Sequence, residues 1–394
     1  MSSPIVAVIK PSGVVRVCVN YQYLNRYTVP DQITLPDVST IIHKVGHARF
    51  ISTFDAPSGY HQCEVAAKDR WKTAFLCGSS LYEWVRCPFG LRSSGCTFVR
   101  AMNKILQSVR TFASNYVDDV AVHSTEWEDH LSNLRDFLVA IRRSGFTLSL
   151  TKARWAKPQV TFLGHVIGSG ERKPDPDRVA AVQKLRAPAT KRQVRQILGF
   201  FGHFSEYIAD YAKLAQPLTA LTVKRYAGRV PWGPREQEAF DTLKEQLIRA
   251  SLEPIGVIDC KKPFVIMVDS SDYAVGGILV QETESGASRP VAFASNKFSS
   301  TQIRWATIEK ECYAIIWALQ KFKQWIFGVP TVVQTDHNPL VYLTETAPKN
   351  AKLMRWLLAI QEFNNVRFEF RAGTRNAAAD CVSRMVYTDD RMRE

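Results

Sequence analysis

The sequence lacks the patterns that would link it to a membrane, an oxidising compartment or a structural zinc ion. No apolar run approaches the ~18 residues that a membrane-spanning helix needs, and no basic and apolar secretory segment follows the N-terminal Met1-Ser2-Ser3-Pro4. Repeats and low-complexity tracts are also absent. No C-x-x-C pair occurs among the eight cysteines, which argues against a zinc site and a disulfide framework. We therefore expect most cysteines to be small hydrophobic residues in a reducing compartment.

Acidic residues are scarce relative to basic ones. Lys and Arg number 51 against 37 Asp and Glu, which gives a formal net charge of +14. Such a surplus suits a polyanionic partner, with nucleic acid first and an anionic membrane second. At 394 residues, of which 46% are hydrophobic, the chain is long enough for two or three domains. Each of these domains could bury a core of its own.

Two adjacent carboxylates, Asp118 and Asp119, lie between short apolar runs. The flanking segments, up to Val117 and from Val120 onward, read as strands. The pair is therefore expected at the tip of a hairpin, where Asp tolerates turn geometry. Adjacent acids repel each other unless they are solvated or bridged by a cation. Taken alone, such a pair is more often a solvated surface turn than a functional site.

A second acidic position shifts the interpretation towards a metal site. Asp55 ends the apolar segment 50–54, and the turn residues Pro57, Ser58 and Gly59 follow it. A strand-end Asp that faces a hairpin-tip Asp pair forms a carboxylate cluster of the kind that holds two hard cations. The sequence therefore predicts a metal-binding cluster composed of Asp55, Asp118 and Asp119.

Three motifs, in this order, resemble the reverse transcriptase of gypsy-type long-terminal-repeat retrotransposons. They are Phe54-Asp55 with Ser58-Gly59-Tyr60-His61-Gln62, Tyr82-Glu83-Trp84 with Pro88-Phe89-Gly90-Leu91, and Tyr116-Val117-Asp118-Asp119. The resemblance implies an α+β multi-domain protein, in which a right-hand polymerase of fingers, palm and thumb precedes an α/β ribonuclease H-like domain. The expected divisions are N-terminally truncated fingers (1–50), a palm with the polymerase site (51–170), a helical thumb or connection (171–255), the ribonuclease H-like domain (256–386) and a tail (387–394).

The resemblance also implies roles for four residues beside the acids. Lys10 and Arg16 flank the turn of an N-terminal hairpin, where they are either solvated charges or, as in the family, contacts for the incoming triphosphate. Tyr60 is either a core aromatic or the family's steric gate against the ribose 2′-hydroxyl. Lys152 is either a surface lysine or, by family position, the proton donor to the leaving pyrophosphate.

Between these positions and the C-terminal third, residues 166–255 change character. A linker at 173–176 precedes three helical patterns, which include 191–207 and 234–250, with Asp175, Thr190 and Pro234 at capping or first-turn positions. Basic residues interleave with aromatic ones throughout this segment. A charge run is usually a solvated face. Beside a carboxylate site, however, it also fits a surface that binds the phosphate backbone of a nucleic-acid duplex.

A second set of acids lies in the C-terminal third. Asp269 and Asp336 each end an apolar strand pattern, Glu311 lies in the first turn of a long helical pattern, and Asp380 lies on the last predicted helix. One acid after each of two strands and one on each of two helices is the layout of the ribonuclease H fold. The segments around these acids resemble that domain of gypsy-type elements, and the helical register favours Glu311 over Glu309. Any one of the four, taken alone, is more often a cap or a surface residue.

The resemblance implies an RNA-directed DNA polymerase with ribonuclease H activity. Two Mg²⁺ ions per site, with Mn²⁺ as the alternative ion, would be held by Asp55, Asp118 and Asp119 in one site and by Asp269, Glu311, Asp336 and Asp380 in the other. The implied partners are an RNA template, a DNA primer, an RNA/DNA hybrid and deoxynucleoside triphosphates, and no membrane. We expect a cytoplasmic location in a retroelement particle, with the nucleus as the alternative.

A rival hypothesis is a catalytically inactive or co-opted remnant that only binds nucleic acid. Three departures from the family pattern favour it. The segment that precedes residue 1 in the family is missing, Asn20 and Gln22 replace an acid and a base, and the stretch after Leu91 lacks a proline. Against it, every acid that the two sites need is present.

Overall fold

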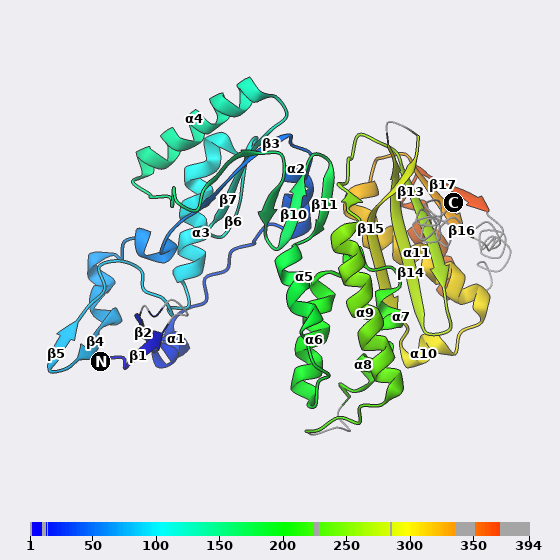
Figure 1. The fold of residues 1–394 in the computed structure, drawn as a ribbon, viewed down its shortest axis with the longest axis horizontal. Helices are drawn as coiled ribbons and strands as arrows, with labels where there is room; N and C mark the ends of the chain where they lie inside the picture. Colours follow the sequence, from blue (N-terminus) through cyan, green and yellow to red (C-terminus); the bar gives the residue numbers. More distant parts are fainter. Residues whose placement is uncertain are drawn as a thin grey trace, which may run out of the picture. The chain divides into compact units, whose positions relative to one another are not determined.

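The computed structural model describes residues 2–9, 13, 15–223, 228–283, 286–335 and 351–370. The chain forms two compact units, Met1–Gly170 and Glu171–Glu394 (Figure 1). Of the residues singled out from the sequence, Lys10, Asp336 and Asp380 lie outside the described residues, as does the tail 387–394. No helix in the described ranges is long and apolar enough to cross a bilayer.

The first unit is built around a four-stranded sheet with the strand order β6-β7-β3-β8. Its strands are β3 (Phe50–Asp55), β6 (Ala113–Tyr116), β7 (Asp119–Ser124) and β8 (Arg154–Lys157). Because successive strand residues point to opposite faces, β3 and β7 contribute to two cores, one beneath α3 (Ser94–Ile105) and α4 (Trp127–Ser144), and one beneath α2 (Val38–Gly46). The buried side chains of the first core include Phe54, Phe98, Met102, Val120, Val122 and Phe137, and those of the second include Ile41, Ile42, Val45, Ile51 and Ala121.

Smaller elements surround this sheet. Three antiparallel hairpins pair β1 (Ile5–Ile9) with β2 (Val15–Val19), β4 (Phe75–Cys77) with β5 (Ser80–Tyr82), and β9 (Val160–Phe162) with β10 (His165–Gly168). The remaining elements of this unit are helical: α1 (Gln22–Tyr27) and the 3₁₀ turns η1 (Gly59–Gln62), η2 (Ala67–Thr73) and η3 (Leu106–Val109).

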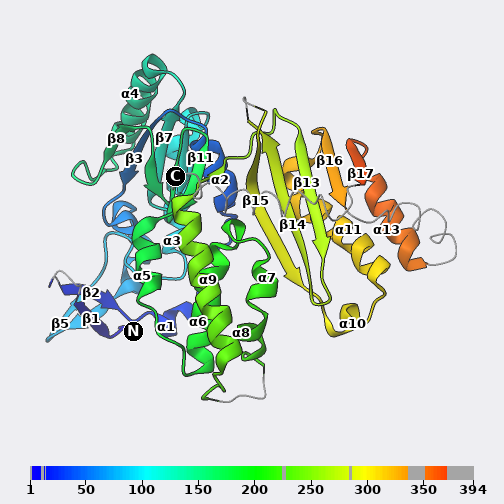
Figure 2. The same ribbon diagram turned by 45° about the vertical axis from the view of Figure 1, so that its right-hand side comes forward.

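The second unit begins with a helical part that follows the predicted pattern. Its helices are α5 (Pro176–Gln183), α6 (Lys191–His203), η4 (Ser205–Tyr207), α7 (Tyr211–Leu214), α8 (Gln216–Ala220) and α9 (Pro234–Leu252). The Asp175 carboxylate accepts a hydrogen bond from Asp177 N at the start of α5, and Thr190 forms a capping box with Gln193 at the start of α6. Helix α5 lies beside α9 (Figures 1 and 2), and α5, α6, α8 and α9 enclose a core that includes Phe201, Phe204, Leu218, Phe240 and Leu243.

The rest of the second unit is a five-stranded sheet with the order β15-β14-β13-β16-β17. Its strands are β13 (Phe264–Ser270), β14 (Ala274–Glu282), β15 (Ser288–Lys297), β16 (Thr331–Thr335) and β17 (Val366–Phe370), and its helices are α10 (Ser300–Ile303), α11 (Thr307–Ile326) and α13 (Ala351–Gln361). Strands β13, β14 and β15 are antiparallel, whereas β16 is parallel to both β13 and β17. Helix α11 packs its buried face on this sheet (Figure 2).

A buried arginine joins the two parts of the second unit. Arg172, which lies on β11 (Glu171–Pro174) beside β12 (Ile255–Gly256), is only 1% exposed. Its guanidinium donates to Glu206 Oε2 at 2.8 Å and to the Val291 carbonyl of β15 at 2.7 Å. A buried charge is tolerated only when such partners replace its water. Arg172 therefore fixes β15 against the helical part.

The helical core predicts a large difference between two apolar residues of the same helix. Phe240 is 0% exposed, whereas Leu252 at the end of α9 is 74% exposed. Phe240→Ala should lower the free energy of unfolding by about 3–5 kcal/mol, because it removes buried area and leaves a cavity. Leu252→Ala, the control, should change it by less than about 0.5 kcal/mol. Urea unfolding followed by circular dichroism measures both, and similar losses in the two variants would contradict the packing described.

The first unit should lose stability as the pH falls below 6.5. Burial, together with the nearby charges of Lys44 and His130, lowers the pKa of His123 on β7 to about 4. The unfolded chain therefore takes up a proton near pH 6.5, whereas the folded chain resists it until about pH 4. The free energy of unfolding keeps its full value above pH 6.5. It decreases by up to about 3 kcal/mol as the pH falls from 6.5 towards 4.

His123→Gln should reduce this pH dependence, because glutamine does not titrate, and the part due to His130, whose pKa burial also lowers, should remain. The measurement is the urea midpoint of wild type and variant between pH 7.5 and pH 4.5. Identical slopes in the two proteins would show that His123 is not the group responsible.

Candidate active sites

The Asp pair lies in a hairpin between β6 and β7, as the sequence predicts, but of the two acids only Asp118 is in the turn, because Asp119 is the first residue of β7. Tyr116 of β6 pairs with Asp119 of β7, so that Val117 and Asp118 alone form the loop. Val117 has φ = 55°, a left-handed conformation that is a clear outlier for a β-branched residue. Such strain costs on the order of 1–3 kcal/mol and persists only where the surrounding structure enforces it. The turn therefore presents Asp118 and Asp119 at the end of the sheet at an energetic cost.

The pairing of β3 with β7 brings the third acid to the same place. Asp55 and Asp119 are opposite each other in the ladder, and Ala56 N donates to the Asp118 carbonyl at 3.2 Å. Burial raises the pKa of the Asp119 carboxyl, and the nearby carboxylates of Asp118 and Asp55 raise it further. The three acids are thus near enough to repel one another, as the sequence predicts for the cluster.

Lys152 is the cation that the structure places at this cluster. Its ammonium lies 2.7 Å from Asp55 Oδ2, although the two residues are 97 positions apart in the chain. The hydrogen bond to Asp55 raises the pKa of Lys152, and the charge of that carboxylate adds to the effect. The Lys152 side chain is 69% exposed, so solvent screens this pair and it contributes little to stability.

The acids carry the donor chemistry of a magnesium site. Carboxylate oxygens are the ligands that Mg²⁺ prefers, and the repulsion that raises the pKa of Asp119 is the kind that a divalent cation relieves. Within the described ranges, however, no three His, Cys, Asp or Glu side chains are grouped so that they could hold a metal ion as they stand. A metal site at Asp55, Asp118 and Asp119 therefore remains a prediction.

Tyr60 lies near the acids in a tightly packed aromatic setting. It belongs to η1, which follows β3, and its ring is 5.2 Å from that of Phe89 and 6.0 Å from that of Phe98. A Cβ atom built on Gly95, in the first turn of α3, would lie 3.6 Å from the Tyr60 hydroxyl. The half-buried ring of Tyr60 therefore packs against two other aromatic rings. Its role as a gate stays a prediction.

Gln62 is a structural link that the sequence does not reveal. Its amide nitrogen donates to the Pro57 carbonyl at 2.9 Å and to the Thr147 carbonyl at 3.1 Å, and its amide oxygen accepts from Thr147 N at 2.8 Å. These bonds tie the turn after Asp55 to the segment that leads to Lys152. The sequence contains Gln62 within a family motif, but a contact across 85 positions has no local signal.

The N-terminal hairpin leaves two predictions open. Arg16 lies on β2 opposite Val8 of β1, so the predicted hairpin is present. The Arg16 side chain and the whole of Lys10 lie outside what the structure describes. A contact between either residue and a triphosphate therefore remains a prediction.

In the second unit the structure describes two of the four predicted acids. Glu311 on α11 is 2% exposed, and its Oε1 accepts a hydrogen bond from the Ser270 hydroxyl at 2.6 Å. Asp269, the neighbour of Ser270 on β13, is exposed and lines a small cavity with Asp210 and Lys213. The Ser270 hydroxyl on β13 therefore helps to orient the Glu311 carboxylate. With Asp336 and Asp380 outside the described residues, the four-acid site stays a prediction.

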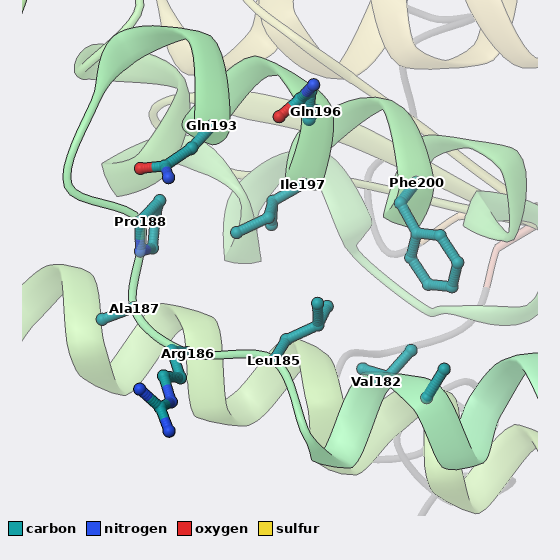
Figure 3. Close-up of a pocket in the computed structure, with 10 residues that line it drawn as sticks. Val182, Leu185, Arg186, Ala187, Pro188, Gln193, Gln196, Ile197 and Phe200 are labelled. Carbon is teal, nitrogen blue, oxygen red and sulfur yellow. The ribbon is translucent and has the colours of Figure 1, made fainter.

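An apolar pocket of about 340 Å³ lies between α5, the loop after it and α6. Ile197 and Phe200 of α6 point towards Val182 and Leu185 on the facing segment (Figure 3). No acidic residue lines the pocket. It is therefore not part of either predicted acid site.

Comparison with protein families matches two parts of the chain. Residues 8–167 match the family described as "Reverse transcriptase (RNA-dependent DNA polymerase)", and residues 259–363 match "RNase H-like domain found in reverse transcriptase". The first match contains Asp55, Asp118 and Asp119, and the second contains Asp269, Glu311 and Asp336, whereas Asp380 lies beyond it. The two families therefore divide the chain in the order that the motifs predict.

Curated relatives match almost the whole chain. The Retrovirus-related Pol polyprotein from transposon opus of Drosophila melanogaster is 34% identical over 95% of this chain and 38% of the relative. The corresponding polyproteins from transposons 297 and gypsy of the same organism are each 32% identical over 94% of this chain, and over 34% and 36% of the relatives. The chain thus spans little more than a third of the length of these relatives.

Solved structures show the same fold. A foamy viral protease-reverse transcriptase dRH in complex with double-stranded DNA matches 94% of this chain and 65% of its own, with a TM-score of 0.84 and 23% identity. A foamy viral protease-reverse transcriptase in complex with RNA/DNA hybrid matches 95% of this chain and 50% of its own, with a TM-score of 0.77 and 22% identity.

The predicted fold class, an α+β multi-domain protein with a polymerase followed by a ribonuclease H-like domain, is confirmed by these matches. The motifs around Asp55 and Asp118, the two family matches and the curated relatives all agree. The chain belongs to the reverse transcriptase and ribonuclease H-like region of the Pol polyproteins of gypsy-type long-terminal-repeat retrotransposons.

Proposed function

We propose that the chain is an RNA-directed DNA polymerase that also hydrolyses the RNA strand of an RNA/DNA hybrid. The observation that supports polymerisation best is the register of β3 on β7, which sets Asp55 opposite Asp119 with Asp118 in the adjoining turn. Three acids at one end of a sheet, beside a lysine and a packed tyrosine, suit nucleotidyl transfer. A general-base mechanism on protein side chains would not need such a concentration of like charge.

Each residue of this site has a distinct proposed task. Asp55 and Asp118 would hold Mg²⁺, with Asp119 as a weaker third ligand. When bound, the metal activates the primer 3′-hydroxyl as a nucleophile and neutralises charge on the phosphates. Lys152 would donate a proton to the departing pyrophosphate. Tyr60 would exclude nucleotides that carry a 2′-hydroxyl.

Lys10 and Arg16 would bind the triphosphate of the incoming deoxynucleotide, since basic side chains suit phosphate oxygens. The net charge of +14 supports binding of a template–primer duplex. The basic residues interleaved through the helical part of the second unit, among them Arg192 and Arg195 on α6, support it too. The foamy viral structures were solved with double-stranded DNA and with RNA/DNA hybrid. We propose the same classes of partner here, together with an RNA template.

The nuclease activity is proposed for the ribonuclease H-like domain. Asp269, Glu311, Asp336 and Asp380 would hold Mg²⁺, which when bound activates a water molecule and stabilises the leaving 3′-oxygen. The Ser270 hydroxyl orients the Glu311 carboxylate from 2.6 Å away. Specificity for a hybrid would come from minor-groove shape and 2′-hydroxyls rather than from base edges.

Two substitutions should separate the activities. Asp118→Asn should reduce primer extension on an RNA template with Mg²⁺ by on the order of 10³-fold or more, and leave cleavage of an RNA/DNA hybrid near normal. Asp269→Asn should do the reverse, because the two sets of acids lie in different units. Asp136→Asn, an exposed acid on α4, is the control and should change neither activity.

The outcomes distinguish the hypotheses. Loss of both activities in one folded variant would contradict two independent sites. A wild-type chain that binds template–primer but does not extend it, with either Mg²⁺ or Mn²⁺, would favour the inactive or co-opted remnant.

A further inference from the structure

Strand β8, which follows Lys152, is joined to β3 through a β-bulge. Ile51 pairs with Lys157 and Thr53 pairs with Arg154, so two residues of β8 lie opposite the single residue Ser52. The second of these, Ala156, has φ = 44°, a left-handed conformation. Its amide donates to the Ser52 hydroxyl at 2.8 Å. A side chain therefore accepts this hydrogen bond at the bulge.

The Ser52 hydroxyl is itself held from the other side by a histidine. His130, in the first turn of α4, is 0% exposed. Its Nε2 is hydrogen bonded to Ser52 Oγ at 2.9 Å, and its Nδ1 to Ser124 Oγ at 3.1 Å. Asn133, also on α4, donates to the same Ser124 hydroxyl at 2.9 Å. A neutral imidazole has one donor and one acceptor nitrogen. His130 uses one nitrogen for Ser52 of β3 and the other for Ser124 of β7, and so bridges the two strands.

The bulge bears directly on the position of Lys152. The segment between Ser149 and Ala156 is attached to β3 at both ends: Ser149 N donates to the Asp55 carbonyl at 2.9 Å, and Ala156 N donates to Ser52 Oγ. Lys152 lies between these two attachments, with its ammonium 2.7 Å from Asp55. A slip of one residue in β8 would turn its side chains to the other face of the sheet.

We infer that Ser52, held in place by His130, is a positioning residue that sets the register of the segment carrying Lys152 and so keeps Lys152 on Asp55. Of these two attachments, only the one at Ala156 depends on a side chain, so substitution of Ser52 loosens this end of the segment. This inference rests on the proposed function, because it gives Lys152 a task in nucleotidyl transfer.

The test compares two buried serines that contact the same histidine. Ser52→Ala removes the acceptor for Ala156 N, whereas Ser124→Ala removes an identical group from His130 without touching β8. Ser52→Ala should lower kcat for deoxynucleotide incorporation by about tenfold, since small misplacements at a reacting centre are costly, and change KM little. Ser124→Ala should change kcat by less than about threefold.

A double-mutant cycle with Lys152→Met distinguishes positioning from a general loss of structure. In the Lys152→Met background, Ser52→Ala should cost less than about a further twofold in kcat, because the residue through which it acts is gone. The same tenfold loss in both backgrounds would overturn the inference. If Ser52→Ala does not fold, Ser52→Cys, which keeps an atom in the place of the hydroxyl but weakens the hydrogen bond, takes its place in the cycle.

Amide hydrogen exchange provides a readout that does not depend on activity. Exchange at Ala156 should become faster in Ser52→Ala and stay unchanged in Ser124→Ala. An inactive wild-type chain would refute the proposed function alone, and faster exchange at Ala156 would still support the role of Ser52. Unchanged exchange in Ser52→Ala would overturn the inference even in an active enzyme.

Discussion

The antiparallel pairing of β3 with β7 is the constraint on which the proposed polymerase site depends. It places Asp55 opposite Asp119, and a shift of one residue would send one of these carboxylates to the other face of the sheet. The register is enforced by the apolar residues on both faces, because Ile51, Val120, Ala121 and Val122 are all 0% exposed. The packing of two cores therefore holds together acids that repel one another.

The site stores unfavourable energy in two forms. One is the charge repulsion that raises the pKa of Asp119, and the other is the left-handed backbone at Val117. Both are local costs that the surrounding sheet offsets, which is the usual arrangement at sites that act on charged ligands. Lys152 relieves the first cost in part, through its contact with Asp55. Cations and phosphates that enter the site would therefore compete with, or replace, a contact that already exists.

The sequence predicts those features that depend on neighbouring residues. The hairpin at Asp118, the caps at Asp175 and Thr190, and the end of α4 at Gly145, with φ = 74°, all follow from local turn and capping chemistry. The contacts that position the site join distant residues instead: Lys152 to Asp55 across 97 positions, and His130 to Ser52 across 78. Neither pair forms a periodic pattern, so a single sequence gives no signal for them. The same holds for Ser270, which only the structure places on Glu311.

These long-range contacts differ in how far they depend on the side chains involved. The β3–β7 ladder consists of backbone hydrogen bonds, and its register is held by several buried apolar side chains together, so no single side chain carries it. The β8 bulge has no such protection, because its bond at Ala156 ends on the hydroxyl of Ser52. The position of the acids therefore depends on many contacts of the β3–β7 pair, whereas the position of Lys152 depends more strongly on one side chain, Ser52. A substitution at Ser52 or at His130 would therefore displace Lys152 more than it would displace Asp55, Asp118 or Asp119.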